Sequence, residues 1–162
     1  VKQGYSIVQS FEYVLIMILA QLPGYIVAAW LVEKLGRKAT LAGFIGCCAV
    51  SAYFFGQAET VTMIVVCGCL MSFFNLGAWG VLYTYTPEQY PTNIRAFGSG
   101  WASAIGRMGG IVAPMVVTHM MIMENGFSQV FMMFTAVLFG VALVILILGE
   151  ETKGKTLESI GL

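Results

Sequence analysis

The polar side chains that are best suited to bind a solute or an ion lie inside long apolar stretches of this sequence. Arg107 follows Ser99 and Ser103 at a spacing of four residues, so one helix face carries all three. An arginine inside a bilayer costs about 2.5–3.5 kcal/mol on insertion scales, so Arg107 is expected to face an interior or a cavity. Its guanidinium could pair with a solute carboxylate or with a neighbouring helix, and the sequence leaves these two alternatives equal.

A second row of polar and aromatic side chains lies upstream. Ser72, Asn75, Trp79 and Tyr83 recur at spacings of three and four residues, so they share one side of a helix. An amide that both donates and accepts, beside amphipathic aromatic rings, suits a small organic solute with an aromatic or carboxylate group. Asn and Ser also join membrane helices by hydrogen bonds, so a packing role is the alternative.

Two further polar residues lie in the most N-terminal apolar stretch. Glu12 is a candidate for proton coupling because intramembrane carboxylates act as proton relays, although the sequence favours an interfacial carboxylate with access to water. Gln21 lies deeper and is a candidate to line a pore. Pro23 cannot donate a backbone hydrogen bond to the Leu19 carbonyl, so we expect a kink there.

A row of small residues forms another helix face. Gly98, Ala102, Gly106 and Gly110 recur every four residues. In membranes such a pattern lets helix backbones approach closely. We expect this face to pack against another helix rather than to contact a solute.

The residue patterns give no support to enzymatic chemistry. The sequence holds no phosphate-binding glycine loop, no metal-ligand cluster and no nucleophile–base pair beside His119, which has no acidic neighbour within a helical turn. We therefore expect no enzyme, no cofactor and no metal. A formal net charge of zero gives no reason to expect nucleic acid as a partner. The four cysteines fit neither zinc spacing nor a disulfide framework, and we interpret them as small hydrophobic residues: Cys47, Cys48, Cys67 and Cys69.

Membrane helices must position these residues. Hydrophobic residues make up 59% of the chain and charged residues 10%, against roughly 45–50% and about 25% in soluble domains. Spanning a bilayer takes about 20 apolar residues. The predicted fold is an all-α membrane protein, with a transmembrane part over 1–149 and a polar tail over 150–162. Five spans are predicted, at about 6–32, 39–57, 60–86, 95–122 and 128–149.

The basic residues indicate how the spans cross the membrane. Alternation of the spans places six basic residues on one side and only Lys2 on the other. By the positive-inside rule the side with six is cytoplasmic, so the chain start is outside and the tail is inside. The start lacks the features of a signal peptide. We predict a multi-pass protein of the plasma (cell inner) membrane, in contact with the lipid bilayer. The six residues are Lys34, Arg37, Lys38, Arg95, Lys153 and Lys155.

Three loop motifs have family counterparts. The loop EKLGRK at 33–38 resembles the signature loop of the major facilitator superfamily, with Ala29 in place of a Gly and Glu33 in place of an Asp. The matching positions are Lys34, Gly36, Arg37 and Lys38.

The other two motifs narrow the resemblance. The segment PEQYPTNIR at 87–95, followed by Gly98 and Gly100, is similar to the stretch between the tenth and eleventh helices of sugar-porter-like and metabolite:proton symporters. The segment ETKGKTLE at 151–158 resembles the tail motif of those families, with Glu150 in place of a Pro.

The resemblance covers the whole chain. It implies helices eight to twelve, which are five of the six helices of the C-terminal half-bundle, with the first helix of that half and the N-terminal half as absent partners. It further implies a secondary active transporter that moves a small organic solute, a sugar or an organic or aromatic acid, together with protons by alternating access. The tenth helix would line the cavity. The alternatives are a non-transporting receptor or scaffold on the same fold, and an inactive truncated fragment.

Charged residues at the cytoplasmic helix ends form the last predicted group. Glu33 and Arg37 lie in the signature loop, Glu88 ends the third span, and Arg95 begins the fourth. Single pairs at a water interface contribute about 0–1 kcal/mol, but a network can hold helix ends together. By resemblance we expect a cytoplasmic gate, which would bias the outward-open state against the inward-open state. Solvated charges that only set the topology are the alternative.

Overall fold

The structure of this protein, a computed structural model, describes residues 7–154. Three predictions lie outside the described residues. They concern the start of the first span at residue 6, Lys2 on the outer side, and the tail from Lys155 onward.

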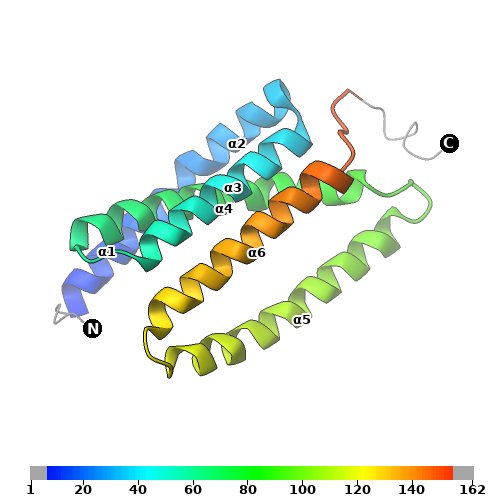
Figure 1. The fold of residues 1–162 in the computed structure, drawn as a ribbon. Helices are drawn as coiled ribbons and strands as arrows, with labels where there is room; N and C mark the ends of the chain where they lie inside the picture. Colours follow the sequence, from blue (N-terminus) through cyan, green and yellow to red (C-terminus); the bar gives the residue numbers. More distant parts are fainter. Residues whose placement is uncertain (1–6, 155–162) are drawn as a thin grey trace.

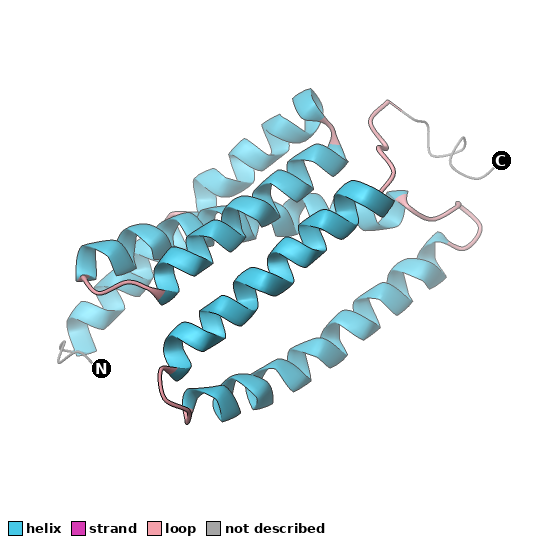
Figure 2. Ribbon diagram, viewed as in Figure 1, coloured by secondary structure: helices cyan, strands magenta, loops and turns pink. Residues whose placement is uncertain are grey.

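The described residues form six α-helices and no strand (Figure 2). Five spans are long and apolar enough to cross a membrane, and the first of them, Ser10–Leu35, contains both α1 and α2. The predicted all-α membrane fold is therefore confirmed. The helices are α1 (Ile7–Leu19), α2 (Gln21–Leu35), α3 (Arg37–Gly56), α4 (Val61–Glu88), α5 (Arg95–Met121) and α6 (Gly126–Leu148).

Two helix boundaries differ from those predicted from the apolar runs of the sequence. The first span is interrupted at Ala20, between α1 and α2, where Pro23 removes the donor that the Leu19 carbonyl would use. At its C-terminal end α4 continues through Pro87 to Glu88, beyond the predicted end at residue 86. Pro114 likewise lies inside α5, and that helix continues through it.

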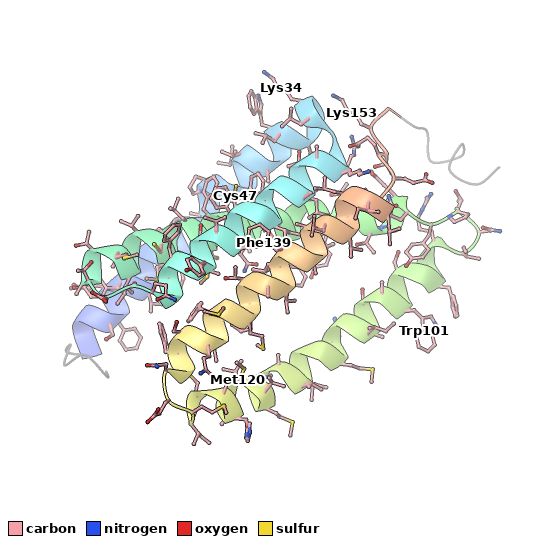
Figure 3. All side chains as sticks on the ribbon, in the orientation of Figure 1. Lys34, Cys47, Trp101, Met120, Phe139 and Lys153 are labelled. Atoms are coloured by element: carbon pink, nitrogen blue, oxygen red, sulfur yellow. The ribbon has the colours of Figure 1, made fainter. Side chains whose placement is uncertain are left out.

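The bundle is centred on α3 and α4. Helix α3 packs against both α4 and α6, and α2 packs against α4 (Figure 1). Leu41 and Phe44 of α3 and Val81 of α4 are buried in the shared core with Ala28 of α2. Helix α5 is joined to α4 and α6 by short loops and has no buried residue. It therefore presents long uncovered sides, and Trp101 projects from the side that faces away from α6 (Figure 3).

Helices α2 and α4 approach each other closely at two glycines. A Cβ built on Gly24 would collide with the backbone carbonyl of Phe73. One built on Gly77 would lie 3.1 Å from the Gly24 carbonyl oxygen and would collide with the ring of Phe44. The glycine row on α5 is different, because a Cβ on Gly106 would meet no atom within 4 Å. Helices α2 and α4 therefore depend on Gly24 and Gly77 for their close contact.

The packing role predicted for the α5 row stays a prediction. Within the described residues a Cβ on Gly98 would contact the ring of Tyr90, and Gly110 has open space like Gly106. Ala102 lies half-buried between them.

Candidate functional site

A pocket of about 480 Å³ lies between the C-terminal part of α4 and the N-terminal half of α5. Its size falls within the roughly 300–1,000 Å³ that is typical of small-molecule sites. The two helices run in roughly opposite directions on either side of the short connection 89–94, which brings the end of α4 beside the start of α5 (Figure 1). The lining residues are Trp79, Leu82, Tyr83, Thr86 and Pro87 from α4, and Ser99, Ala102, Ser103, Gly106 and Arg107 from α5.

The α4 wall is aromatic. The ring centroids of Trp79 and Tyr83 lie 5.5 Å apart with an interplanar angle of 37°. Trp79 is 45% exposed and Tyr83 is 69% exposed, so both rings have free surface for a flat ligand. Each ring also carries one polar group, the indole N–H or the phenol hydroxyl, at the edge of an apolar face.

The α5 wall carries the charge. Arg107 and Ser103 line the pocket opposite the aromatic rings, as their common helix face predicts. Arg107 is exposed and makes no ion pair with any described residue. Ser99 lines the same wall, and its hydroxyl is buried without a hydrogen-bond partner in the described part of the chain. The pocket thus combines an unpaired guanidinium, hydroxyl groups and two aromatic rings.

The other predicted solute-binding residues lie elsewhere. Asn75 is exposed one turn before Trp79 and does not line the pocket, and neither does Ser72. Gln21 begins α2, and Glu12 is exposed on α1, which contacts α4. Their predicted roles in solute binding and proton coupling stay predictions. Thr86, which the sequence reasoning missed, continues the spacing of the α4 row and could have been found from it.

A charged network occupies the end of the bundle where the tail leaves α6, which we call the tail end. Arg37 Nε lies 3.3 Å from Glu88 Oε2, so the structure pairs two of the four residues predicted to cluster there. Arg95 donates hydrogen bonds from Nε to the Pro87 carbonyl at 3.0 Å and from Nη2 to the Thr92 hydroxyl at 3.4 Å. Glu33 is exposed and takes no part in the ion pairs of the described residues. The role of the network as a gate stays a prediction.

Glu151 of the tail binds the N-terminus of α3. Its Oε1 accepts a hydrogen bond from the Arg37 backbone N–H at 2.9 Å, and its Oε2 accepts one from the Lys38 backbone N–H at 3.2 Å. A helix N-terminus has free N–H groups and a positive dipole end, so a carboxylate is favourable there. Gly36 just before the helix has φ of 96°, and a Cβ on it would lie 2.5 Å from the Glu151 carboxylate. The position therefore requires glycine.

The hydrogen bonds to Glu151 also set its protonation. Burial by itself raises the pKa of the Glu151 carboxyl. Hydrogen bonds from the backbone N–H groups of Lys153, Arg37, Lys38 and Thr152 outweigh burial and lower the pKa below its ordinary value of 4.5. Glu151 is therefore an anion near neutral pH.

Neighbouring tail residues form hydrogen bonds with the C-terminal ends of α4 and α2. The Tyr85 hydroxyl donates to the Glu150 carbonyl at 2.9 Å, and the Thr152 hydroxyl donates to the Glu88 carboxylate. Lys153 Nζ donates to the Lys34 carbonyl at 2.6 Å, and the two lysines lie at the same end of the bundle (Figure 3). The segment 150–153 therefore connects the ends of α2, α3 and α4.

Comparisons with known proteins identify the family of the chain. The family model described as Major Facilitator Superfamily matches residues 6–161. A niacin transporter from Acinetobacter baylyi is 83% identical over 100% of this chain and 37% of that protein. A putative niacin/nicotinamide transporter from Bacillus subtilis is 56% identical over 96% of this chain and 39% of that protein. A putative metabolite transport protein from Escherichia coli is 32% identical over 86% of this chain and 30% of that protein. The chain thus spans less than two fifths of the length of these curated relatives.

Proposed function

Since this chain belongs to the Major Facilitator Superfamily, we propose that it forms part of a secondary active transporter that carries nicotinate by alternating access. The names of the relatives from Acinetobacter baylyi and Bacillus subtilis support niacin as the solute. Niacin is a pyridine ring that bears one carboxylate, so it is flat, aromatic and anionic near neutral pH.

The observation that carries the proposal is the pocket between α4 and α5. It holds the Arg107 guanidinium on one wall and the rings of Trp79 and Tyr83 on the other. A guanidinium can bind a carboxylate through two parallel hydrogen bonds, and an aromatic ring stacks favourably on another by about 0.5–1.5 kcal/mol beyond its area burial. One pocket therefore offers a guanidinium for the carboxylate of nicotinate and aromatic rings for its pyridine ring.

A longer protein would complete the site. Transporters of this kind enclose their solute near the bilayer midplane, between two repeats of helices. The chain spans 37% of the niacin transporter from Acinetobacter baylyi, and α5 has no buried residue in the described structure. We propose that further helices of the same transporter cover α5 and close the pocket. The positive-inside rule would place the tail end, with its ion pair between Arg37 and Glu88, in the cytoplasm.

Proton coupling follows from the charge of the solute. Moving one negative charge inward against a membrane potential costs about 2.3 kcal/mol per 100 mV. One proton carried with nicotinate cancels that cost. The pocket-lining residues include no carboxylate, so we propose that the proton is carried elsewhere, with Glu12 as the candidate within the described residues.

Uptake into proteoliposomes tests this function. The complete transporter is reconstituted, and radiolabelled nicotinate uptake is measured with and without an imposed inward proton gradient. We expect accumulation that the gradient stimulates and that Arg107→Gln abolishes. Arg107→Lys keeps the charge but loses the two-point hydrogen bonding, so it should raise the apparent KM with near-normal expression. Unchanged KM in both variants would show that Arg107 is structural. Nicotinamide, which lacks the carboxylate, should compete far less well than nicotinate.

A further inference from the structure

The pocket places two small residues of α5 opposite the aromatic wall. Ala102 and Gly106 line the cavity between the hydroxyl-bearing turn of Ser99 and the guanidinium of Arg107. Across from them lie the exposed rings of Trp79 and Tyr83. The pocket is thus a slot between an aromatic wall, formed by Trp79 and Tyr83, and a wall of small residues, formed by Ala102 and Gly106. The guanidinium of Arg107 lies beside the wall of small residues.

We infer that Gly106 determines specificity, because its missing side chain leaves room for one aromatic ring between α5 and the rings of α4. The inference rests on the proposed transport of nicotinate through this pocket. It assigns Gly106 to solute selection rather than to contact between helices.

The packing of the described helices does not account for glycine at this position. A Cβ on Gly106 would meet no atom within 4 Å, whereas a Cβ on Gly24, Gly68 or Gly77 would collide with a neighbouring helix. Glycine inside a helix costs about 1 kcal/mol relative to alanine. Among the described helical glycines with open space, Gly106 is the one that lines the pocket, where that space can hold a ligand. The others with similar open space do not line it: Gly43, Gly46, Gly100, Gly109, Gly110 and Gly140.

The position of Gly106 also fits the geometry of the solute. It precedes Arg107 in the chain, and a ring bonded directly to a carboxylate lies within a few ångströms of the guanidinium that binds it. Gly106 and Arg107 line the same pocket, so a ring held by that guanidinium would occupy the cavity that Gly106 borders. Two turns earlier, the buried Ser99 hydroxyl has no partner in the described residues, which indicates that this wall is incomplete without a further polar group.

The size of the expected effect comes from methyl-group discrimination. One methylene in a closely fitting pocket changes discrimination by about 10- to 200-fold. Gly106→Ala adds one methyl group to the slot, so nicotinate should lose affinity within that range. A substituted ring should lose more affinity than the unsubstituted ring, so the ratio of the affinity for nicotinate to that for 5-methylnicotinate should rise in the variant.

Gly110→Ala is the matched control. Gly110 lies on the same helix, a Cβ on it would also meet no atom within 4 Å, and it does not line the pocket. Radiolabelled nicotinate binding to the complete transporter is measured for both variants, together with 5-methylnicotinate competition, expression level and thermal unfolding. We expect weaker binding and a higher affinity ratio in Gly106→Ala only, at normal expression and stability.

The outcomes separate the inference from the function on which it rests. If the wild type binds nicotinate, Arg107→Gln abolishes binding, and Gly106→Ala matches Gly110→Ala in affinity and affinity ratio, then the inference is wrong and the transport proposal stands. If Gly106→Ala lowers expression or unfolding temperature and leaves the affinity ratio unchanged, the residue packs against another helix. If the wild type does not bind nicotinate, both proposals are overturned.

Discussion

Gly24→Ala is expected to destabilise the contact between α2 and α4, although alanine favours helices more than glycine does. The added methyl group would collide with the backbone carbonyl of Phe73. Gly77, on the other helix, approaches the Gly24 carbonyl at the same crossing, so neither helix can yield without losing contact. The obstacle is backbone that packing holds in place, rather than the far end of a flexible side chain.

Two opposing effects set the magnitude. Alanine gains about 1 kcal/mol over glycine in a helix interior. Overpacking a well-filled contact costs typically about 1–3 kcal/mol, and a collision with backbone belongs at the upper end of that range. The net result is a loss of about 2 kcal/mol of unfolding free energy. In a domain of 150–250 residues this lowers Tm by about 4–8 °C.

A glycine with free space gives the control. A Cβ on Gly140 in α6 would meet no atom within 4 Å, so Gly140→Ala should leave Tm unchanged or raise it slightly. Thermal unfolding of both variants in detergent, followed by circular dichroism at the helix band, tests the pair. The reasoning is refuted if Gly24→Ala unfolds at or above the wild-type temperature.

Two further predictions concern the tail end. Glu151→Gln removes the carboxylate from the N-terminus of α3, so amide hydrogen exchange at Arg37 and Lys38 should accelerate several-fold, whereas Glu124→Gln at the opposite end of the bundle should leave it unchanged. Because the folded pKa of Glu151 lies below its ordinary 4.5, its contribution is complete well above pH 4.5 and declines as pH falls through the lowered value. The protection factor of these two amides, which corrects for the slower intrinsic exchange in acid, should therefore fall as the solution is acidified, but not in Glu151→Gln. Arg37→Gln and Glu88→Gln in a double-mutant cycle should give a coupling of about 0–1 kcal/mol, because the ion pair is only half-buried, and a coupling above about 2 kcal/mol would contradict this.

The sequence predicts the elements that depend on local chain properties. Apolar runs of bilayer length give the five spans, because lipid leaves a helix as the natural way to satisfy the backbone. The pocket could also be anticipated in part. The rows that contain Tyr83 and Ser103 flank one short connection, so two antiparallel helices bring them together whatever the rest of the fold.

Contacts between distant segments could not be predicted in this way. Glu151 binds the Arg37 amide across 114 residues, and no local pattern marks a carboxylate as the cap of a remote helix. Similarly, the regular glycine row on α5 is more conspicuous in the sequence than Gly24 or Gly77, yet these two glycines make a close contact between described helices, whereas a Cβ on Gly106 would meet no atom within 4 Å. Which glycine is needed depends on which neighbour covers it, and tertiary packing decides that.

The absence of buried residues in α5 bears on how the chain enters a membrane. Among the five spans, α5 has the lowest mean hydropathy, and it carries Arg107 three turns from its start. Its partitioning from the translocon into lipid is therefore the least favourable of the five. The following span, α6, has the highest mean hydropathy and begins after a connection of only four residues, 122–125. We therefore expect the two helices to insert cooperatively, with the strongly apolar α6 holding α5 in the bilayer until other helices shield its arginine.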